Sequence, residues 1–224
     1  MDPVTARPGY LAGLDIGQRD DWTALAVAER DRDGGLTLVA LERIRHRSYP
    51  DVALLVADTM RALPGATLLV DVTGVGRPIC DLLRQHGVAH IRVNIHGGNA
   101  VGRLDDGTVS VPKRDLIAAL VVGFEAKTLR IASGLHHTEA LEREAASFRM
   151  AVSATGHDTY NAREGAHDDL LLAVSLTAWH AKRQRPFRPA AGGSRPIVDG
   201  YRALVRRDLG QPPPRPRLEL PRLP

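Results

Sequence analysis

The N-terminal part of the chain alternates between short apolar runs and polar breaks. In the second run, alanines alternate with Leu25 and Val27, a spacing that is typical of a β-strand. The breaks between the runs contain Gly and Asp, which favour tight turns. We therefore predict three consecutive antiparallel strands. They cover residues 10–16, 22–29 and 36–44.

From residue 50 onward, apolar residues recur at helical spacing in several segments, with short apolar runs between them. Predicted helices cover residues 50–63, 78–85, 113–127, 138–148 and 166–182, and predicted strands cover residues 67–72 and 91–95. Residues 97–111 are rich in Gly and Asp and are predicted as a loop or small hairpin, and residues 150–162 as a hairpin. This order of elements implies an α/β fold with a mixed sheet flanked by helices.

The composition changes after residue 182. Nine of the fifteen prolines lie beyond it, and residues 183–224 contain ten Arg, no Lys and three acids, which gives +7 in a chain of net charge +4. We expect an N-terminal extension (1–9), one domain (10–182) and a basic Pro-rich tail (183–224) that is extended or disordered. The tail either contacts a polyanion or is a solvated segment without a partner.

Composition also excludes several classes of protein. No apolar run approaches the ~20 residues of a membrane helix, and residues 1–9 lack the apolar stretch of a secretory signal. The single cysteine, Cys80, allows no intramolecular disulfide, and its apolar helical surroundings favour a place in the core. We expect a cytoplasmic protein with no membrane partner.

Acidic residues stand at three positions where an uncompensated charge is costly. Asp15 and Asp71 end two apolar strands, and Asp168 and Asp169 open the last long helix. Parallel neighbouring strands would bring the first two to one edge of the sheet, and a helix across that edge would add a third. Oxygen ligands without thiols suit Mg²⁺ or Mn²⁺. Two such ions about 4 Å apart can activate water and stabilise the leaving oxygen of a phosphodiester.

Each acid also has a purely structural interpretation. Asp15 fits a turn after a strand, Asp71 fits the cap of the next helix, and Asp168 or Asp169 fits an N-cap. The combination of all these acids on this order of strands and helices favours a catalytic site.

Four motifs occur in order along the chain. They are Asp15-Ile16-Gly17 with Asp21-Trp22-Thr23-Ala24-Leu25, then Asp71-Val72-Thr73-Gly74-Val75-Gly76, then Val111-Pro112-Lys113-Arg114-Asp115-Leu116, and finally His167-Asp168-Asp169-Leu170 with Ala173. As an ordered set, the motifs resemble the nuclease domain of the bacteriophage terminase large subunit, a member of the RNase H-like (RuvC-like) nuclease superfamily. The resemblance extends from about Tyr10 to Lys182.

The resemblance implies an RNase H-like fold and two-metal cleavage of duplex DNA. It implies that Asp15, Asp71, Asp168 and Asp169 are the catalytic residues and the ligands of two Mg²⁺ or Mn²⁺ ions. It further implies cutting of concatemeric viral DNA during packaging in the host cytoplasm, with a terminase ATPase, a small terminase subunit and a portal as partners. The chain contains no Gly-x-x-x-x-Gly-Lys-[Ser/Thr] motif, so an ATPase motor cannot be assigned to it.

Several other polar residues have two interpretations. Arg103, Lys113 and Arg114 flank the loop after the fifth strand and either contact DNA phosphates or form a solvated face. His167 either assists the neighbouring acids or makes a hydrogen bond at the start of the helix.

Two rival functions share parts of this pattern. Asp15-x-Gly and Asp71-x-x-Gly-x-Gly faintly resemble the phosphate loops of an actin-like ATPase, but such proteins need two of these domains and this chain has room for one. A non-catalytic DNA-binding or packaging module would have no reason to keep costly carboxylates at the ends of strands.

Overall fold

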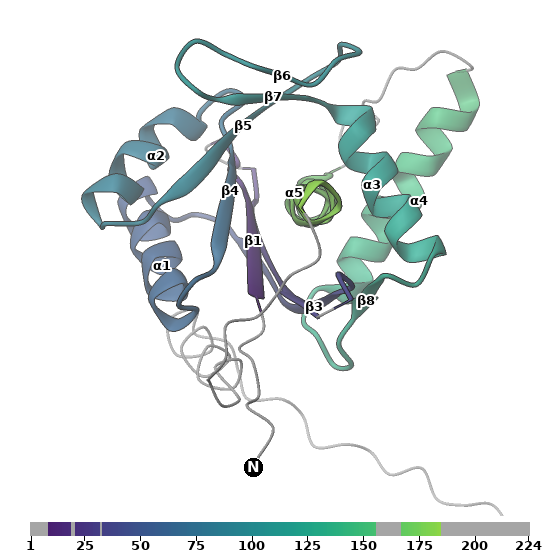
Figure 1. Ribbon diagram of the computed structural model, residues 1–224, viewed down its shortest axis with the longest axis horizontal. Coiled ribbons are helices and arrows are strands. Elements are labelled where there is room, and N and C mark those ends of the chain that lie inside the picture. Colours follow the sequence, from purple (N-terminus) through teal and green to yellow (C-terminus); the bar gives the residue numbers. More distant parts are fainter. Residues whose placement is uncertain (1–8, 19–20, 32, 156–166, 185–224) are drawn as a thin grey trace, which may run out of the picture.

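The computed structural model describes residues 9–18, 21–31, 33–155 and 167–184. Eight strands form one sheet, and five helices cover its two faces (Figure 1). The strands are β1 (Gly9–Asp15), β2 (Thr23–Arg30), β3 (Leu36–Ile44), β4 (Thr67–Asp71), β5 (His90–His96), β6 (Gly102–Arg103), β7 (Val109–Pro112) and β8 (Leu129–Ile131). The helices are α1 (Tyr49–Ala62), α2 (Gly76–Gln85), α3 (Lys113–Glu125), α4 (Thr138–Thr155) and α5 (Asp169–Arg183).

The strand order is β6-β7-β5-β4-β1-β2-β3-β8. β1, β2 and β3 form the antiparallel meander that the alternation of apolar and polar residues predicts. β4 joins the other side of β1 in parallel, and β5 and β7 continue the parallel half. The mixed α/β sheet with flanking helices is therefore confirmed.

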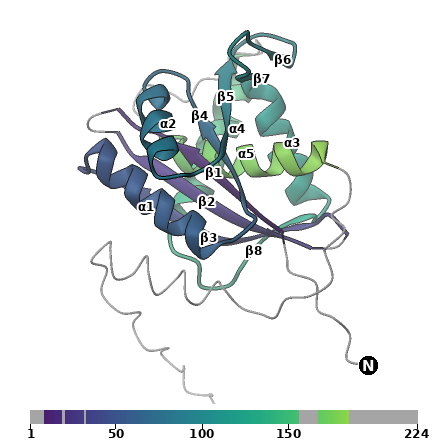
Figure 2. The ribbon, with the colours of Figure 1, turned by 60° about the vertical axis from the view of Figure 1, so that its left-hand side comes forward.

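Two hydrophobic cores lie on opposite faces of this sheet, because side chains alternate across each strand. α1 and α2 cover one face, where they lie side by side over the strands (Figure 2). On the other face α5 packs against β1 and β2, and α3 and α4 pack against α5 (Figure 1). Cys80 is buried in the first of these cores, as its apolar surroundings predict.

The close approach of α5 to β1 depends on Gly13. A Cβ atom at this position would lie 2.0 Å from the carbonyl oxygen of Ala173, so only glycine fits. With no side chain between them, the backbone of α5 lies directly against the strand that ends in Asp15. The start of α5 is thereby fixed over the end of β1.

Three segments differ from the sequence predictions or refine them. The hairpin predicted for residues 150–162 is wrong where it is described, because α4 continues to Thr155. No glycine or proline interrupts the helix before Gly156. β8 was not predicted, and it adds to the sheet by parallel pairing with β3. The segment 97–111 contains the antiparallel pair β6–β7, which confirms the small hairpin.

The predicted N-terminal extension and the basic tail lie almost wholly outside the described residues, as does the rest of the predicted 150–162 hairpin. Among the helices that are described, none is long and apolar enough to cross a membrane.

Candidate active site

Asp15 and Asp71 end neighbouring parallel strands. Leu14 of β1 is paired with Val70 of β4, so the two aspartates follow at the same level and point to the face that α5 covers. Both are nearly buried, with 8% of Asp15 and 6% of Asp71 exposed. The Thr73 backbone N–H donates to Asp71 Oδ1 at 2.8 Å, which fixes the orientation of that carboxylate. The two acids therefore meet at one edge of the sheet, as their strand positions predict.

Asp168 and Asp169 lie at the start of α5, above the same edge. Asp168 occupies the N-cap position, and Asp169 is the first residue of the helix. The Lys113 ammonium donates to Asp168 Oδ2 at 2.6 Å, and the Arg43 guanidinium donates to Asp169 Oδ2 at 3.3 Å. Four carboxylates from three elements are thus gathered between one cation from the start of α3 and one from the end of β3.

The pKa values show how strongly these carboxylates affect one another. Burial raises the pKa of Asp15 well above its usual value, and the charges of Asp71, Asp169 and Asp168 raise it further. Burial raises the pKa of Asp71 to about 6, although hydrogen bonds from Thr73 and the charge of Lys113 oppose this. Burial also raises the pKa of Asp169. Without added cations, the site holds more negative charge than its surroundings favour.

Arg43, which pairs with Asp169, is itself held by Glu144 and Trp22. Arg43 lies 3.2 Å from a carboxylate oxygen of Glu144 in α4, and its guanidinium stacks on the Trp22 ring at 4.8 Å. The other oxygen of Glu144 accepts the backbone N–H of Leu171 at 2.9 Å. Burial raises the pKa of Glu144 to about 7. Glu144 therefore joins the first turn of α5 to the residue that holds Asp169.

The sequence pattern did not predict Arg43 or Glu144 as site residues. Arg43 lies in an apolar strand near the strand end, where a buried cation is as costly as a buried acid, and this is the signal that was available. Glu144 lies in a helix rich in Glu and Arg, a pattern that normally indicates a solvated surface. Only the packing of α4 against α5 distinguishes it from its exposed neighbours.

The donor set fits a hard divalent cation, because carboxylate oxygens are the ligands that Mg²⁺ and Mn²⁺ prefer. In the described part of the chain, no three His, Cys, Asp or Glu side chains are close enough together to hold a metal ion. The ion pairs give a physical reason. Lys113 pairs with Asp168 and Arg43 pairs with Asp169, so in this structure both carboxylates of α5 face a cation of the protein.

The remaining predicted site residues are distributed unevenly. His167 is exposed at the start of α5, with Nδ1 3.7 Å from Asp169 Oδ2. Arg114 lies beside Lys113 and donates to the side chain and the backbone oxygen of Asn99 at 2.7 and 2.8 Å. Arg103 is not brought to this edge. It lines a pocket with Trp179 and Arg183, close to the opposite end of α5.

The chain is similar to known proteins in its structure. No protein-family model and no curated protein sequence matches the chain. The large terminase nuclease from thermophilic phage G20c, solved with bound magnesium, superimposes with a TM-score of 0.57 at 20% identity, over 76% of this chain and 80% of that one. Its structure with bound cobalt gives the same values.

The large terminase nuclease domain of bacteriophage SPP1, solved with bound Mn, matches with a TM-score of 0.50 at 15% identity, over 75% of this chain and 84% of that one. At such low identity these matches establish the fold and leave the activity to be argued from the site. The described chain has the RNase H-like fold of large terminase nuclease domains.

Proposed function

We propose that this protein is a metal-dependent endonuclease that cleaves duplex DNA. The observation that carries the proposal is the convergence of Asp15, Asp71, Asp168 and Asp169 at one edge of the sheet. They come from two strands and a helix that are far apart in the sequence. Such a cluster opposes folding unless cations compensate it, and the raised pKa values of Asp15 and Asp71 indicate that Lys113 and Arg43 do so only in part.

The four aspartates would hold two Mg²⁺ or Mn²⁺ ions, whose chemistry is to activate a water and to stabilise the leaving oxygen of the phosphodiester. Asp15 ends a strand that is paired on both sides, with β2 and with β4, so it would fix the position of the site. Asp71, which the hydrogen bond from Thr73 orients, would be the second ligand that the sheet supplies. Asp168 and Asp169 are held in place by their ion pairs with Lys113 and Arg43 and would supply the ligands from α5.

Without cations, the cluster repels a phosphodiester. Lys113 is partly accessible, with 18% of its side chain exposed, and would be available to the DNA backbone if Asp168 bound a metal ion in its place. Exclusion of bulk water by the surrounding cores keeps these electrostatic interactions strong.

We further infer that the substrate is concatemeric viral DNA that is cut during genome packaging. This inference is supported by the fold and by the motif resemblance. A terminase ATPase, a small terminase subunit and a portal are the partners that would present the DNA in the host cytoplasm. The described residues provide no zinc finger for reading base edges, so we expect cleavage with little base preference.

The test is cleavage of a supercoiled plasmid with Mg²⁺, Mn²⁺, Ca²⁺ or EDTA, followed by mapping of the product ends. We expect nicking and linearisation with Mn²⁺ or Mg²⁺, poor cleavage with Ca²⁺ because its coordination is looser, and none in EDTA. The matched control is Asp15→Asn, which preserves the shape of the side chain. Cleavage in EDTA, or wild-type cleavage by that variant, would contradict the proposed mechanism.

A further inference from the structure

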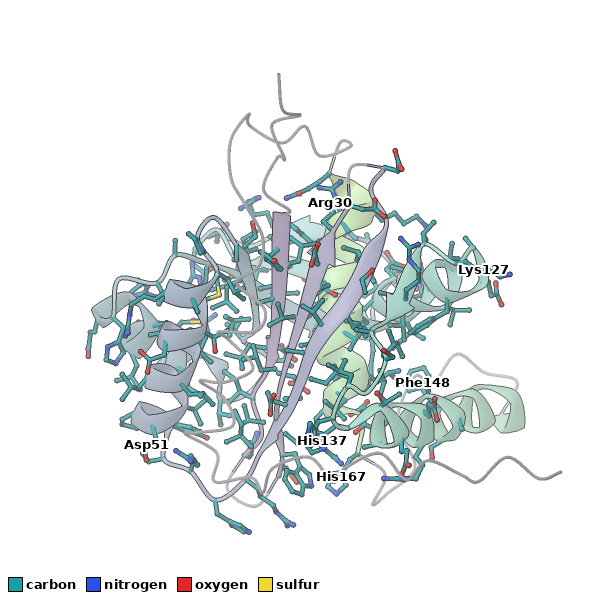
Figure 3. The ribbon with its side chains drawn as sticks, turned by 90° about the horizontal axis from the view of Figure 1, so that it is seen from below. Arg30, Asp51, Lys127, His137, Phe148 and His167 are labelled. Carbon is teal, nitrogen blue, oxygen red and sulfur yellow. The ribbon has the colours of Figure 1, made fainter. Side chains whose placement is uncertain are left out.

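A pocket with both polar and apolar lining residues lies at the same end of the sheet as the carboxylates. It has a volume of about 380 Å³ and is formed by the turn after β1, the end of β3 and the start of α1. Figure 3 shows this end of the molecule, with Asp51 at the start of α1 and His167 before α5, whereas Arg30 lies at the opposite end. The pocket and the candidate active site therefore lie at the same end of the sheet, the pocket on the face that α1 covers and the carboxylates on the face that α5 covers.

The chemistry of this pocket is that of an anion site. Arg45, His46 and Arg47 are consecutive, exposed and line it, and the acid among the lining residues is Asp21. His46 has a left-handed backbone conformation with φ of 57°, which is uncommon for a residue other than glycine. Such strain is concentrated at ligand-binding turns and needs support from its surroundings.

Trp22 links the pocket to the candidate active site. The Arg45 guanidinium lies over the Trp22 ring at 5.2 Å, and the Arg43 guanidinium that holds Asp169 lies over the same ring at 4.8 Å. In addition, the Gly17 backbone N–H donates to Thr23 Oγ1 at 3.2 Å, which ties the turn after Asp15 to the pocket wall. The basic residues are thus held in a defined position relative to the carboxylates.

The register of the sheet gives the separation. Asp15 is paired with Ala24, and Thr23, which lines the pocket, is paired with Ile44. Neighbouring strands are about 4.8 Å apart, so the pocket begins one to two strand spacings from Asp15. A DNA strand advances about 3.4 Å along the duplex axis per nucleotide and covers this separation in about one to three nucleotides.

The geometry points to a binding site for a backbone phosphate of the DNA strand being cleaved, a few nucleotides from the scissile phosphate, formed by Arg45, His46 and Arg47 in the pocket between β3 and α1. This inference rests on the proposed nuclease function and assigns a path to its substrate. The strand crosses the carboxylates from Lys113 and Arg114 on the β7–α3 side to Arg45 and Arg47 on the β3–α1 side. Cations on both sides draw the backbone onto a centre that would otherwise repel it.

The test is DNA binding by an Arg45→Gln/Arg47→Gln double variant of the full chain. A short labelled duplex is titrated in Ca²⁺ across a salt series, so that binding is measured with little cleavage. Each lost phosphate contact reduces the slope of log K against log salt by about 0.9. We expect a reduction of nearly two and a loss of about tenfold in affinity at low salt. The matched control is Arg61→Gln/Arg84→Gln, which removes the same charge from exposed ends of α1 and α2.

Steady-state cleavage with Mn²⁺ separates this binding site from the chemistry. The double variant should have a raised KM and a nearly unchanged kcat, whereas Asp15→Asn should lose kcat. An Arg45→Lys/Arg47→Lys variant keeps the charge and should retain most of the salt slope, which distinguishes a lost contact from a disturbed fold. If the double variant binds DNA with the affinity and slope of the control, the phosphate site does not exist. If the wild-type protein binds with the expected slopes but never cleaves, the nuclease proposal fails and the phosphate site remains.

Discussion

Asp15 is the residue at which electrostatics and folding conflict most strongly. It is buried, and three other carboxylates raise its pKa beyond the effect of burial. A carboxyl group whose pKa is higher in the folded than in the unfolded protein stabilises the fold fully at pH values below its unfolded-state pKa. This contribution is lost as pH rises through its folded-state pKa. For Asp71 this window runs from 3.8 to about 6. The metal-free protein should therefore lose stability as pH rises toward neutrality.

We predict that Asp15→Asn makes the metal-free protein more stable at pH 7 while it removes cleavage. The amide keeps the shape of the side chain and removes the central charge. A gain in stability at the expense of activity is common when functional sites are mutated. Thermal unfolding with EDTA and with Mn²⁺ measures this effect. Metal bound at 100 times its Kd stabilises a protein by about 2.7 kcal/mol, and the variant should lose most of that gain. A lower melting temperature than wild type in EDTA would show that Asp15 has a structural role.

Asp168 and Asp169 should differ in importance. Adjacent helical residues point about 100° apart, and here each is held by a different cation. The charge of Asp169 raises the pKa of Asp15 more than the charge of Asp168 does, so Asp169 interacts more strongly with Asp15. We predict that Asp169→Asn abolishes plasmid nicking and that Asp168→Asn only weakens it. Near-wild-type rates for both single variants would mean that α5 supplies no ligand.

The sequence identified the four acids because each stands at the end of an apolar strand or the start of a helix, where charge is conspicuous. It did not identify the residues that orient them. Glu144 looks like any other surface glutamate until α4 is placed against α5, and the β3 register is needed to bring Arg43 beside Asp169. Residue type reports chemistry, whereas contacts between distant elements become visible only in the fold.

At the scale of elements, the start of α5 has no side-chain cap of its own, since Asp168 makes no capping hydrogen bond. Glu144 supplies the missing acceptor from α4 through its bond to the Leu171 N–H. We predict that Glu144→Ala lowers the free energy of unfolding by about 1–3 kcal/mol, the cost of an unsatisfied buried donor. The loss of Arg43's partner should also slow cleavage. Glu144→Gln retains an acceptor and should recover most of the stability.

The control for this prediction is Glu142→Ala, an exposed position on the same helix. Chemical denaturation and single-turnover cleavage are measured for all three variants. Equal stability of the Glu144→Ala and Glu142→Ala proteins would show that the remote cap contributes nothing.

Gly13 controls the distance between α5 and β1. Because an added Cβ would meet the Ala173 carbonyl oxygen at 2.0 Å, Gly13→Ala must displace the helix that carries two of the four acids. We predict a large loss of stability, in the range above about 3 kcal/mol that is exceptional for single substitutions, together with loss of cleavage. Gly97→Ala, where a Cβ meets nothing within 4 Å, is the matched control. Equal melting temperatures for the two variants would contradict the close packing.

Elements with strong periodicity were predicted from the sequence, and the exceptions have physical reasons. β8 has three residues, too few for an alternation to be recognised, and its pairing with β3 joins segments about ninety positions apart. Residues 150–155 continue α4 instead of starting a hairpin, because no glycine or proline interrupts the helix before Gly156. The meander and the central parallel strands were predictable because each is a short run rich in apolar residues with clear turn residues beside it.

At the scale of the whole molecule, charge is separated along the chain. Residues 185–224 contain nine arginines and three acids and so carry a net charge of +6. The whole chain has a net charge of +4, so residues 1–184 carry −2. An acidic site that must receive a polyanion benefits from a basic segment that raises the local concentration of DNA. This segment lies outside the described residues, so the expectation rests on composition alone.

We predict that removal of residues 185–224 weakens DNA binding and leaves the domain folded. The cut belongs after Gln184, because its side-chain oxygen accepts from Arg30 at 2.8 Å and Arg183 stacks on Trp179 at 5.0 Å. The truncated protein should keep its melting temperature and its kcat with Mn²⁺. Its affinity for duplex DNA should fall and the salt slope should decrease, because contacts from an arginine-rich segment are to phosphate and release counterions. Sequence preference should not change, since phosphate contacts carry no base information. Unchanged affinity with the same salt slope would mean that the tail is a passive linker and that Arg45, Arg47 and Lys113 account for the binding.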